Sequence, residues 1–127
     1  MMKILLTGSN GMVGKNILAH NSAINYNFLT PSSKDLNLLN YQDVKKYIAI
    51  HQPEFVIHAA GKVGGIQANI KEPVSFLIDN IDMGRNIIMA ANTNNIKNLL
   101  NLSSSCMYPR NAKNPLSESL ILKGELE

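Results

Sequence analysis

Cysteine, tryptophan and charged residues are scarce in this sequence. The 127 residues include one cysteine, Cys106, and no tryptophan, and 17% of them are charged. A single cysteine forms neither an internal disulfide nor a cysteine-based zinc site, so we expect a reducing compartment and no metal. The net charge of +3 is spread along the chain without a basic run, which gives nucleic-acid binding little support.

Long apolar runs are missing as well. No stretch approaches the ~20 residues that cross a bilayer, and the apolar run before Gly8 is too short for a secretion signal. We therefore expect a cytoplasmic protein without membrane partners. Hydrophobic residues make up 45% of the chain, enough for one core, and this length has room for one domain, residues 1–127.

The N-terminal stretch Lys3–Gly14 has the strongest local pattern. Apolar residues end at Leu6, and three glycines follow at spacings of three before a helix-compatible segment. This order predicts a strand, a tight turn and a helix N-terminus whose N–H groups face a pyrophosphate. A structural turn without a ligand is the alternative, because glycine turns are common. The predicted cofactor-binding residues here are Gly8, Ser9, Asn10, Gly11, Met12, Val13 and Gly14.

Strand-like and helix-like segments alternate through the rest of the chain. Strands are predicted at residues 25–30, 54–58 and 98–102, with helices after Asn40 and from Pro73. The segment 35–40 reads either as an abbreviated strand or as a loop. The alternation predicts an α/β fold, a Rossmann-type doubly wound parallel sheet that is truncated after its fourth or fifth strand.

The helix from Pro73 is predicted to have one apolar stripe, with residues 77, 81, 84, 88 and 91 at helical spacing. Asn80 falls on the same stripe. Because a buried amide must find partners, Asn80 either bridges to main-chain groups or joins a polar active-site network. The spacing leaves both alternatives open.

The end of the second predicted strand decides between the two nicotinamide cofactors. A carboxylate there would bind the adenosine ribose and repel a 2′-phosphate. The sequence offers Ser32, Ser33 and Lys34 as donors before its first acid, Asp35, which favours NADP(H). In a shifted register Lys34 is a solvated turn residue and Asp35 binds the ribose. We predict cofactor contacts from Lys34, Asp35 and Leu36.

Small residues follow the predicted strand at 54–58. Ala59, Ala60 and Gly61 would let a cofactor lie across the carboxyl end of this strand, although they are also typical of close packing. The next segment, 62–66, is a glycine-rich loop at the edge expected to hold the ligand. His58 is an acid or base by type, and we interpret it as a packed strand-end residue.

A polar run, residues 103–106, ends the strand at 98–102. A serine there can orient a carbonyl, and a thiol can move a proton once its pKa is lowered. Serines also end strands for no chemical reason. The run is therefore a candidate for chemistry that the pattern alone leaves open.

Several motifs together resemble one family. Thr-Gly-Ser-Asn-Gly-Met-Val-Gly at 7–14, His-Ala-Ala-Gly at 58–61 and Ser-Ser-Ser-Cys-Met-Tyr-Pro at 103–109, with Asn80, resemble the extended short-chain dehydrogenases that modify nucleotide sugars. Lys-Val-Gly-Gly-Ile at 62–66 and Asp-Leu-Asn-Leu-Leu at 35–39 are similar to the GDP-L-fucose synthase branch of that family. The resemblance extends over nearly the whole chain.

This resemblance implies an NADP-dependent epimerase and reductase that converts GDP-4-keto-6-deoxymannose to GDP-L-fucose. It implies that Ser104 hydrogen-bonds the sugar carbonyl and that Cys106 deprotonates the adjacent carbon. The family's Tyr-x-x-x-Lys pair has no counterpart before Glu127, so we expect an N-terminal portion that is inactive alone. Another sugar-nucleotide epimerase or reductase, or a non-catalytic dinucleotide-binding module, are the alternatives. A homodimer is compatible with the sequence.

Overall fold

A four-stranded parallel sheet forms the centre of the computed structural model, which describes residues 1–126. The strands lie in the order β2-β1-β3-β4, with β1 pairing in parallel with both β2 and β3. The first strand is therefore interior, and the glycine turn follows its carboxyl end. This arrangement confirms the predicted α/β fold. The strands are β1 (Lys3–Thr7), β2 (Asn27–Leu29), β3 (Phe55–His58) and β4 (Asn98–Asn101).

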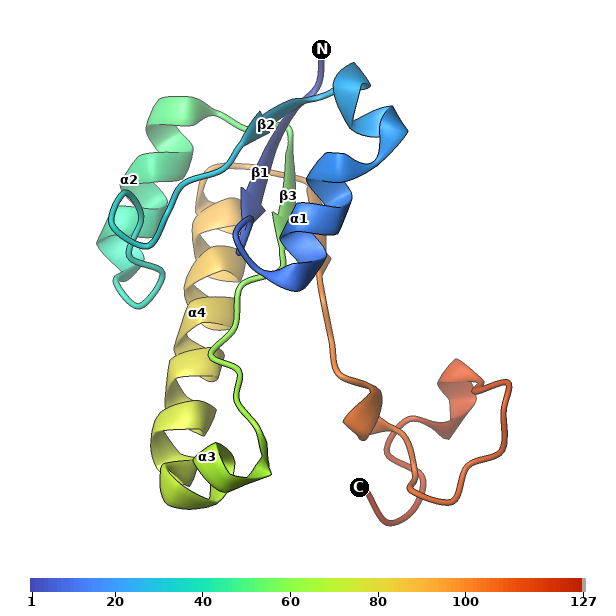
Figure 1. The fold of residues 1–127 in the computed structure, drawn as a ribbon. Coiled ribbons are helices and arrows are strands. Elements are labelled where there is room, and N and C mark those ends of the chain that lie inside the picture. The colour runs from blue at the N-terminus through green and yellow to red at the C-terminus, as the bar shows by residue number, and fades with distance from the viewer. Residues whose placement is uncertain (127) are drawn as a thin grey trace.

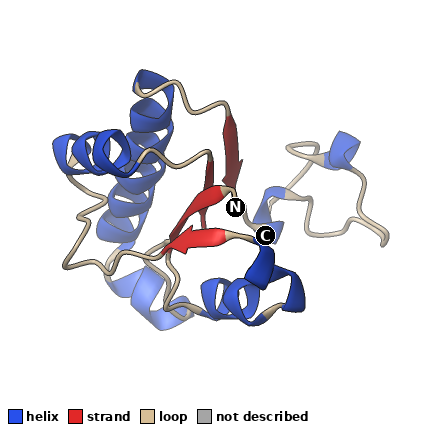
Figure 2. Ribbon diagram, turned by 90° about the horizontal axis from the view of Figure 1, so that it is seen from above, coloured by secondary structure: helices blue, strands red, loops and turns tan. Residues whose placement is uncertain are grey.

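Helices cover both faces of the sheet. Figures 1 and 2 show α2 and α4 together on one face and α1 on the other. The chain after β4 extends away from the sheet in both views. No helix in residues 1–126 is both long and apolar enough to cross a membrane. The helices are α1 (Met12–Ala19), α2 (Tyr41–His51), α3 (Ile66–Lys71) and α4 (Pro73–Thr93), with short 3-10 helices at Asn21–Asn25, Ser105–Met107 and Glu118–Leu120.

The main core lies between the sheet and the pair α2 and α4. Leu5 and Val56 point from the strands into this layer and are fully buried against Val44, Ile48 and Ile87. The sequence selects this arrangement because side chains alternate across a strand and recur every three or four residues on a helix. Burial of apolar side chains in this layer holds β1 and β3 in place below the glycine turn.

The prediction that one apolar stripe of α4 faces the core is wrong for most of the helix. Leu77, Ile81 and Ile88 are 59%, 52% and 50% exposed, whereas Ile87 and Ala91 are buried. A helix of 21 residues is about 30 Å long, but strands of four or five residues reach only about 15 Å. The N-terminal part of α4 therefore projects past the sheet, as Figure 1 shows, and its apolar face has no layer to pack against.

The segment 35–40 forms turns and a loop, which settles the alternative left open by the sequence. The N–H groups of Asp35 and Leu36 donate to the Ser32 carbonyl, and that of Asn40 donates to the Asn37 carbonyl. The second strand is shorter than the predicted 25–30, and the fourth ends one residue before the predicted position. β4 lies at one edge of the sheet.

Candidate functional site

The glycine turn joins β1 to α1 in a conformation that side chains would block. Gly8 has φ +71, and a Cβ there would lie 2.6 Å from the main chain of Ala59 and Ala60. The Gly11 N–H donates to the Gly8 carbonyl over 3.0 Å, and Gly11 immediately precedes α1. The turn therefore packs against the residues that follow β3, and α1 begins directly after the turn. This matches the geometry expected of a phosphate-binding turn.

A buried pair of side chains joins the two strand ends beneath this turn. Thr7 Oγ1 lies 2.7 Å from His58 Nδ1, and the two residues are 2% and 5% exposed. The Ala60 N–H also donates to Thr7 Oγ1 over 3.4 Å. Burial lowers the pKa of His58, which favours the neutral imidazole. His58 is thus the packed strand-end residue that the sequence indicated.

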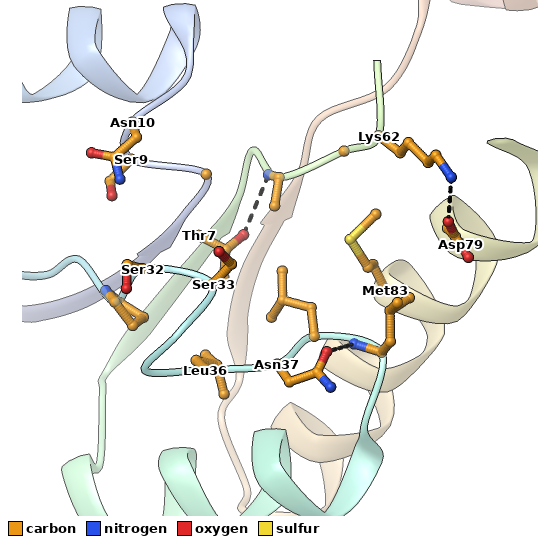
Figure 3. Close-up of a pocket in the computed structure, with 16 residues that line it drawn as sticks. Thr7, Ser9, Asn10, Ser32, Ser33, Leu36, Asn37, Lys62, Asp79 and Met83 are labelled. Carbon is orange, nitrogen blue, oxygen red and sulfur yellow. Dashed lines mark hydrogen bonds and ion pairs between the residues drawn. The ribbon is translucent and has the colours of Figure 1, made fainter. Parts of the chain in front are cut away.

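A cavity of about 410 Å³ opens at the carboxyl ends of β1, β2 and β3 (Figure 3). This edge of a parallel sheet is where open α/β folds bind ligands. In the view of Figure 3, Asn10 and Lys62 lie on opposite sides of the cavity. Its lining comes from residues 7–10 of the turn, 31–33 after β2, the loop 36–39, residues 60–62 after β3, and Asp79 and Met83 of α4.

The turn after β2 presents hydroxyl groups to the cavity and keeps its carboxylate occupied. Asp35 Oδ2 accepts hydrogen bonds from Ser32 Oγ over 2.6 Å and Ser32 N over 3.0 Å. These bonds lower the pKa of Asp35, the side-chain bond most. Ser32 and Ser33 line the cavity, whereas Lys34 and Asp35 lie outside its lining. The two serines are therefore the polar residues that line the cavity at this strand end.

The far side of the cavity carries an ion pair that the sequence did not place in the site. Lys62 Nζ lies 2.8 Å from Asp79 Oδ2 and also contacts Ser75 Oγ. The hydrogen bond from Lys62 is the main reason that the pKa of Asp79 is lowered. Among the described residues, Lys62 is the only cation in the lining. The glycine-rich loop 62–66 was the available signal, but its partner on α4 is seventeen residues away.

The structure brings part of the predicted cofactor set together. Gly11 and Gly14 shape the turn, and a Cβ at Gly14 would lie 2.5 Å from Ser9 Cα. Met12 and Val13 line a separate apolar hollow beside α1 instead. Ala59 contacts the turn without lining the cavity. The predicted residues that do line it are Gly8, Ser9, Asn10, Leu36, Ala60 and Gly61.

The two candidate catalytic residues lie outside the cavity. Ser104 and Cys106 are exposed and belong to the segment after β4, where Ser104 Oγ accepts from the Cys106 N–H over 3.2 Å. Because all four strands are parallel, this segment leaves the same edge of the sheet as the glycine turn. The cavity is also lined by residues outside the predicted cofactor set, namely Thr7, Pro31–Ser33, Asn37–Leu39, Lys62, Asp79 and Met83.

A parallel sheet, a glycine turn at its first strand and a cavity at the strand ends define a dinucleotide-binding α/β fold. Residues 4–126 match the family described as the NAD dependent epimerase/dehydratase family, and the chain belongs to that family. It is 59% identical over 126 residues to a GDP-L-colitose synthase of Yersinia pseudotuberculosis and 46% identical over 125 residues to a GDP-L-fucose synthase of Azorhizobium caulinodans. The resemblance inferred from the motifs is confirmed.

These relatives are longer than the chain. The alignments cover 99% and 98% of this chain but 41% and 40% of the two synthases. Among solved structures, the chain is similar to MlghC, a GDP-mannoheptose C4 reductase from Campylobacter jejuni with NADP bound, with a TM-score of 0.88 and 32% identity. That alignment covers 99% of this chain and 40% of MlghC. The chain spans about two fifths of the curated relatives that it matches.

Proposed function

We propose that residues 1–127 are the dinucleotide-binding portion of an NADP-dependent epimerase and reductase of GDP-linked sugars. The observation that carries this proposal is the cavity at the glycine turn, with Ser32 and Ser33 at its β2 side and the Asp35 carboxylate held outside it. A site without a carboxylate at this position accepts a 2′-phosphate that an acidic site would repel. The NADP bound by the similar reductase supports the same cofactor.

The lining residues offer partners for the adenosine and pyrophosphate parts of NADP(H). The turn after Gly8 and the start of α1 offer their N–H groups, except that of Gly11, and the positive end of a helix dipole to the pyrophosphate. The hydroxyl of Ser33 is a donor for the 2′-phosphate, whereas the hydroxyl proton of Ser32 is given to Asp35. Leu36 and Met83 give the cavity apolar walls suited to adenine. Bound NADPH would supply the hydride of the reduction.

The substrate side of the proposal rests on the segment after β4. Ser104 would donate a hydrogen bond to the keto oxygen of the sugar, and Cys106 would take the proton from the adjacent carbon. The exposure of both side chains leaves them open to a ligand. GDP-4-keto-6-deoxymannose is the proposed substrate and GDP-L-fucose the product. Formation of GDP-L-colitose is the second candidate, favoured by the 59% identity to a colitose synthase.

Titration of the 127-residue chain with NADPH and NADH tests the cofactor assignment. We expect saturable binding of NADPH, seen as a change in its fluorescence, with a Kd at least tenfold lower than that for NADH. Equal or stronger binding of NADH would contradict the role of the serines. The substrate assignment is tested in the polypeptide that the complete reading frame encodes, by conversion of each GDP-linked keto sugar with NADPH.

A further inference from the structure

Asn80 fixes the main chain of the cavity wall that follows β3. Its Oδ1 accepts from the Lys62 N–H over 2.8 Å, and its Nδ2 donates to the Lys62 carbonyl over 2.9 Å. Nδ2 also donates to the Phe76 carbonyl of its own helix over 2.7 Å. The amide therefore holds both polar groups of one wall residue against α4. The bridge to main-chain groups, one of the two sequence alternatives for Asn80, is present, although Asn80 is exposed and not buried as its place on the predicted stripe implied.

Asn86 makes the corresponding contact to the opposite wall. Its side chain is 1% exposed, and Nδ2 donates to the Leu38 carbonyl over 2.9 Å. Its Oδ1 accepts from Arg85 Nη2 over 3.4 Å. Leu38 belongs to the loop 36–39, which lines the cavity. In the sequence, Leu38 lies 48 positions before Asn86. A buried amide that reaches a distant loop in this way fixes that loop on the helix.

Met83 lies between these two amides along α4. Spacings of three place residues 80, 83 and 86 along one side of the helix. Met83 lines the cavity, and Figure 3 shows its side chain between Lys62 on one wall and Asn37 on the other. One stretch of helix thus lines the cavity through Met83 and supplies a hydrogen-bonded anchor for each of two walls.

We infer that Asn80 and Asn86 are positioning residues that set the width of the dinucleotide cavity. Each ties a wall segment of loop conformation to a rigid helix, so the ligand meets walls that are already placed and binding loses less freedom. The inference rests on the proposed function, because it assigns these residues to the binding of the same NADP(H). Neither residue lines the cavity, so both act through Lys62 and Leu38.

The variants Asn80→Ala and Asn86→Ala in the 127-residue chain test this inference. We expect the Kd for NADPH to rise at least fivefold in each. In the ligand-free chain, amide hydrogen exchange should accelerate at 60–62 in the first variant and at 36–39 in the second. Because Asn80 is exposed, its replacement leaves the core intact, and it carries the test if Asn86→Ala does not fold.

Asn94→Ala is the matched control. Asn94 caps the C-terminus of the same helix, and its amide donates to the Ala90 carbonyl of α4 over 2.8 Å and to the Lys45 carbonyl of α2 over 3.4 Å, away from the cavity. Its loss should lower thermal stability without changing the Kd for NADPH. Unchanged binding by Asn80→Ala, or equal weakening by the control, overturns the inference. Failure of the wild-type chain to bind NADPH contradicts the proposed function instead, and the exchange pattern then tests the wall anchors alone.

Discussion

Thr7 Oγ1 and His58 Nδ1 lie 2.7 Å apart and join the carboxyl ends of β1 and β3 inside the protein. The first strand end carries the glycine turn, and the second carries the small residues that the turn packs against. The hydroxyl of Thr7 also accepts from the Ala60 N–H. The Thr7 side chain therefore connects the strand that leads into the glycine turn to the strand end that the turn packs against.

Replacement of this threonine should destabilise the fold. Thr7→Val keeps the shape but leaves His58 Nδ1 buried without its partner, which costs about 1–3 kcal/mol. Thr7→Ser keeps the hydroxyl and should lose less. Urea unfolding measures both free energies. Thr93→Val is a control, because the exposed Thr93 hydroxyl donates only within its own helix turn and contacts Tyr41. A loss no larger than that of the control would show that the pair contributes little.

His58 should make stability depend on pH near neutrality. Its pKa in the folded chain is below the ordinary 6.5, so the unfolded chain binds more protons between the two values. The contribution is fully present above pH 6.5 and is lost as the pH falls through the folded pKa. The pKa values of Asp35 and Asp79 are lowered from the ordinary 3.8, so these carboxylates change the stability only at more acidic pH, below about 3.8. Acidification to about pH 5 therefore isolates His58.

Thermal unfolding between about pH 7 and 5 measures this effect. The melting temperature of the wild-type chain should fall on acidification. His58→Asn retains a polar atom for Thr7 but does not titrate, so its curve should be flatter. Parallel curves for the wild type and His58→Asn would refute the assignment.

The fold and the glycine turn could be predicted because both depend on patterns among neighbouring residues. The spacing of Gly8, Gly11 and Gly14 after an apolar run defines a strand, a turn and a helix start without reference to distant residues. Asn40 likewise caps α2 as its position indicates, accepting from the N–H groups of Gln42 and Asp43. Local rules suffice where a residue's partners are a few positions away.

The remaining site residues depend on contacts that local patterns do not encode. Lys62 pairs with Asp79 from a different element, and Asn86 reaches Leu38 across 48 positions. The side of α4 that faces the core depends on where the sheet ends, so periodicity alone assigned Leu77 to the wrong environment. The orientation of Asp35 depends on its bonds to Ser32, which sequence reasoning did not anticipate.

A carboxylate introduced at the serine turn should reverse the cofactor preference. In Ser33→Asp the new side chain lies at a position that lines the cavity, where it would repel a 2′-phosphate and accept from the ribose hydroxyls of NADH. We expect the Kd for NADPH to rise at least tenfold while that for NADH stays constant or falls. Lys34→Asp lies outside the lining and should change the ratio less. Equal effects at both positions would mean that only net charge matters.

Two glycine-to-alanine changes should have opposite effects on stability. At Gly8, φ is +71 and the new methyl group would overlap the main chain of Ala59 and Ala60, so the strain alone should cost about 1–3 kcal/mol. Because the strain acts on the turn, NADPH binding should be lost as well. At Gly84, within α4, a Cβ meets nothing within 4 Å, and alanine should stabilise the helix by about 0.5–1 kcal/mol.

Chemical denaturation and NADPH titration of the two variants compare these positions directly. Gly84→Ala should unfold at a higher urea concentration than the wild type and bind NADPH unchanged, because Gly84 is outside the cavity lining. Gly8→Ala should unfold at a lower concentration, and its remaining folded fraction should not bind NADPH. Tight binding by folded Gly8→Ala would show that the cofactor does not use this turn, since a side chain there cannot be accommodated without moving the end of β3.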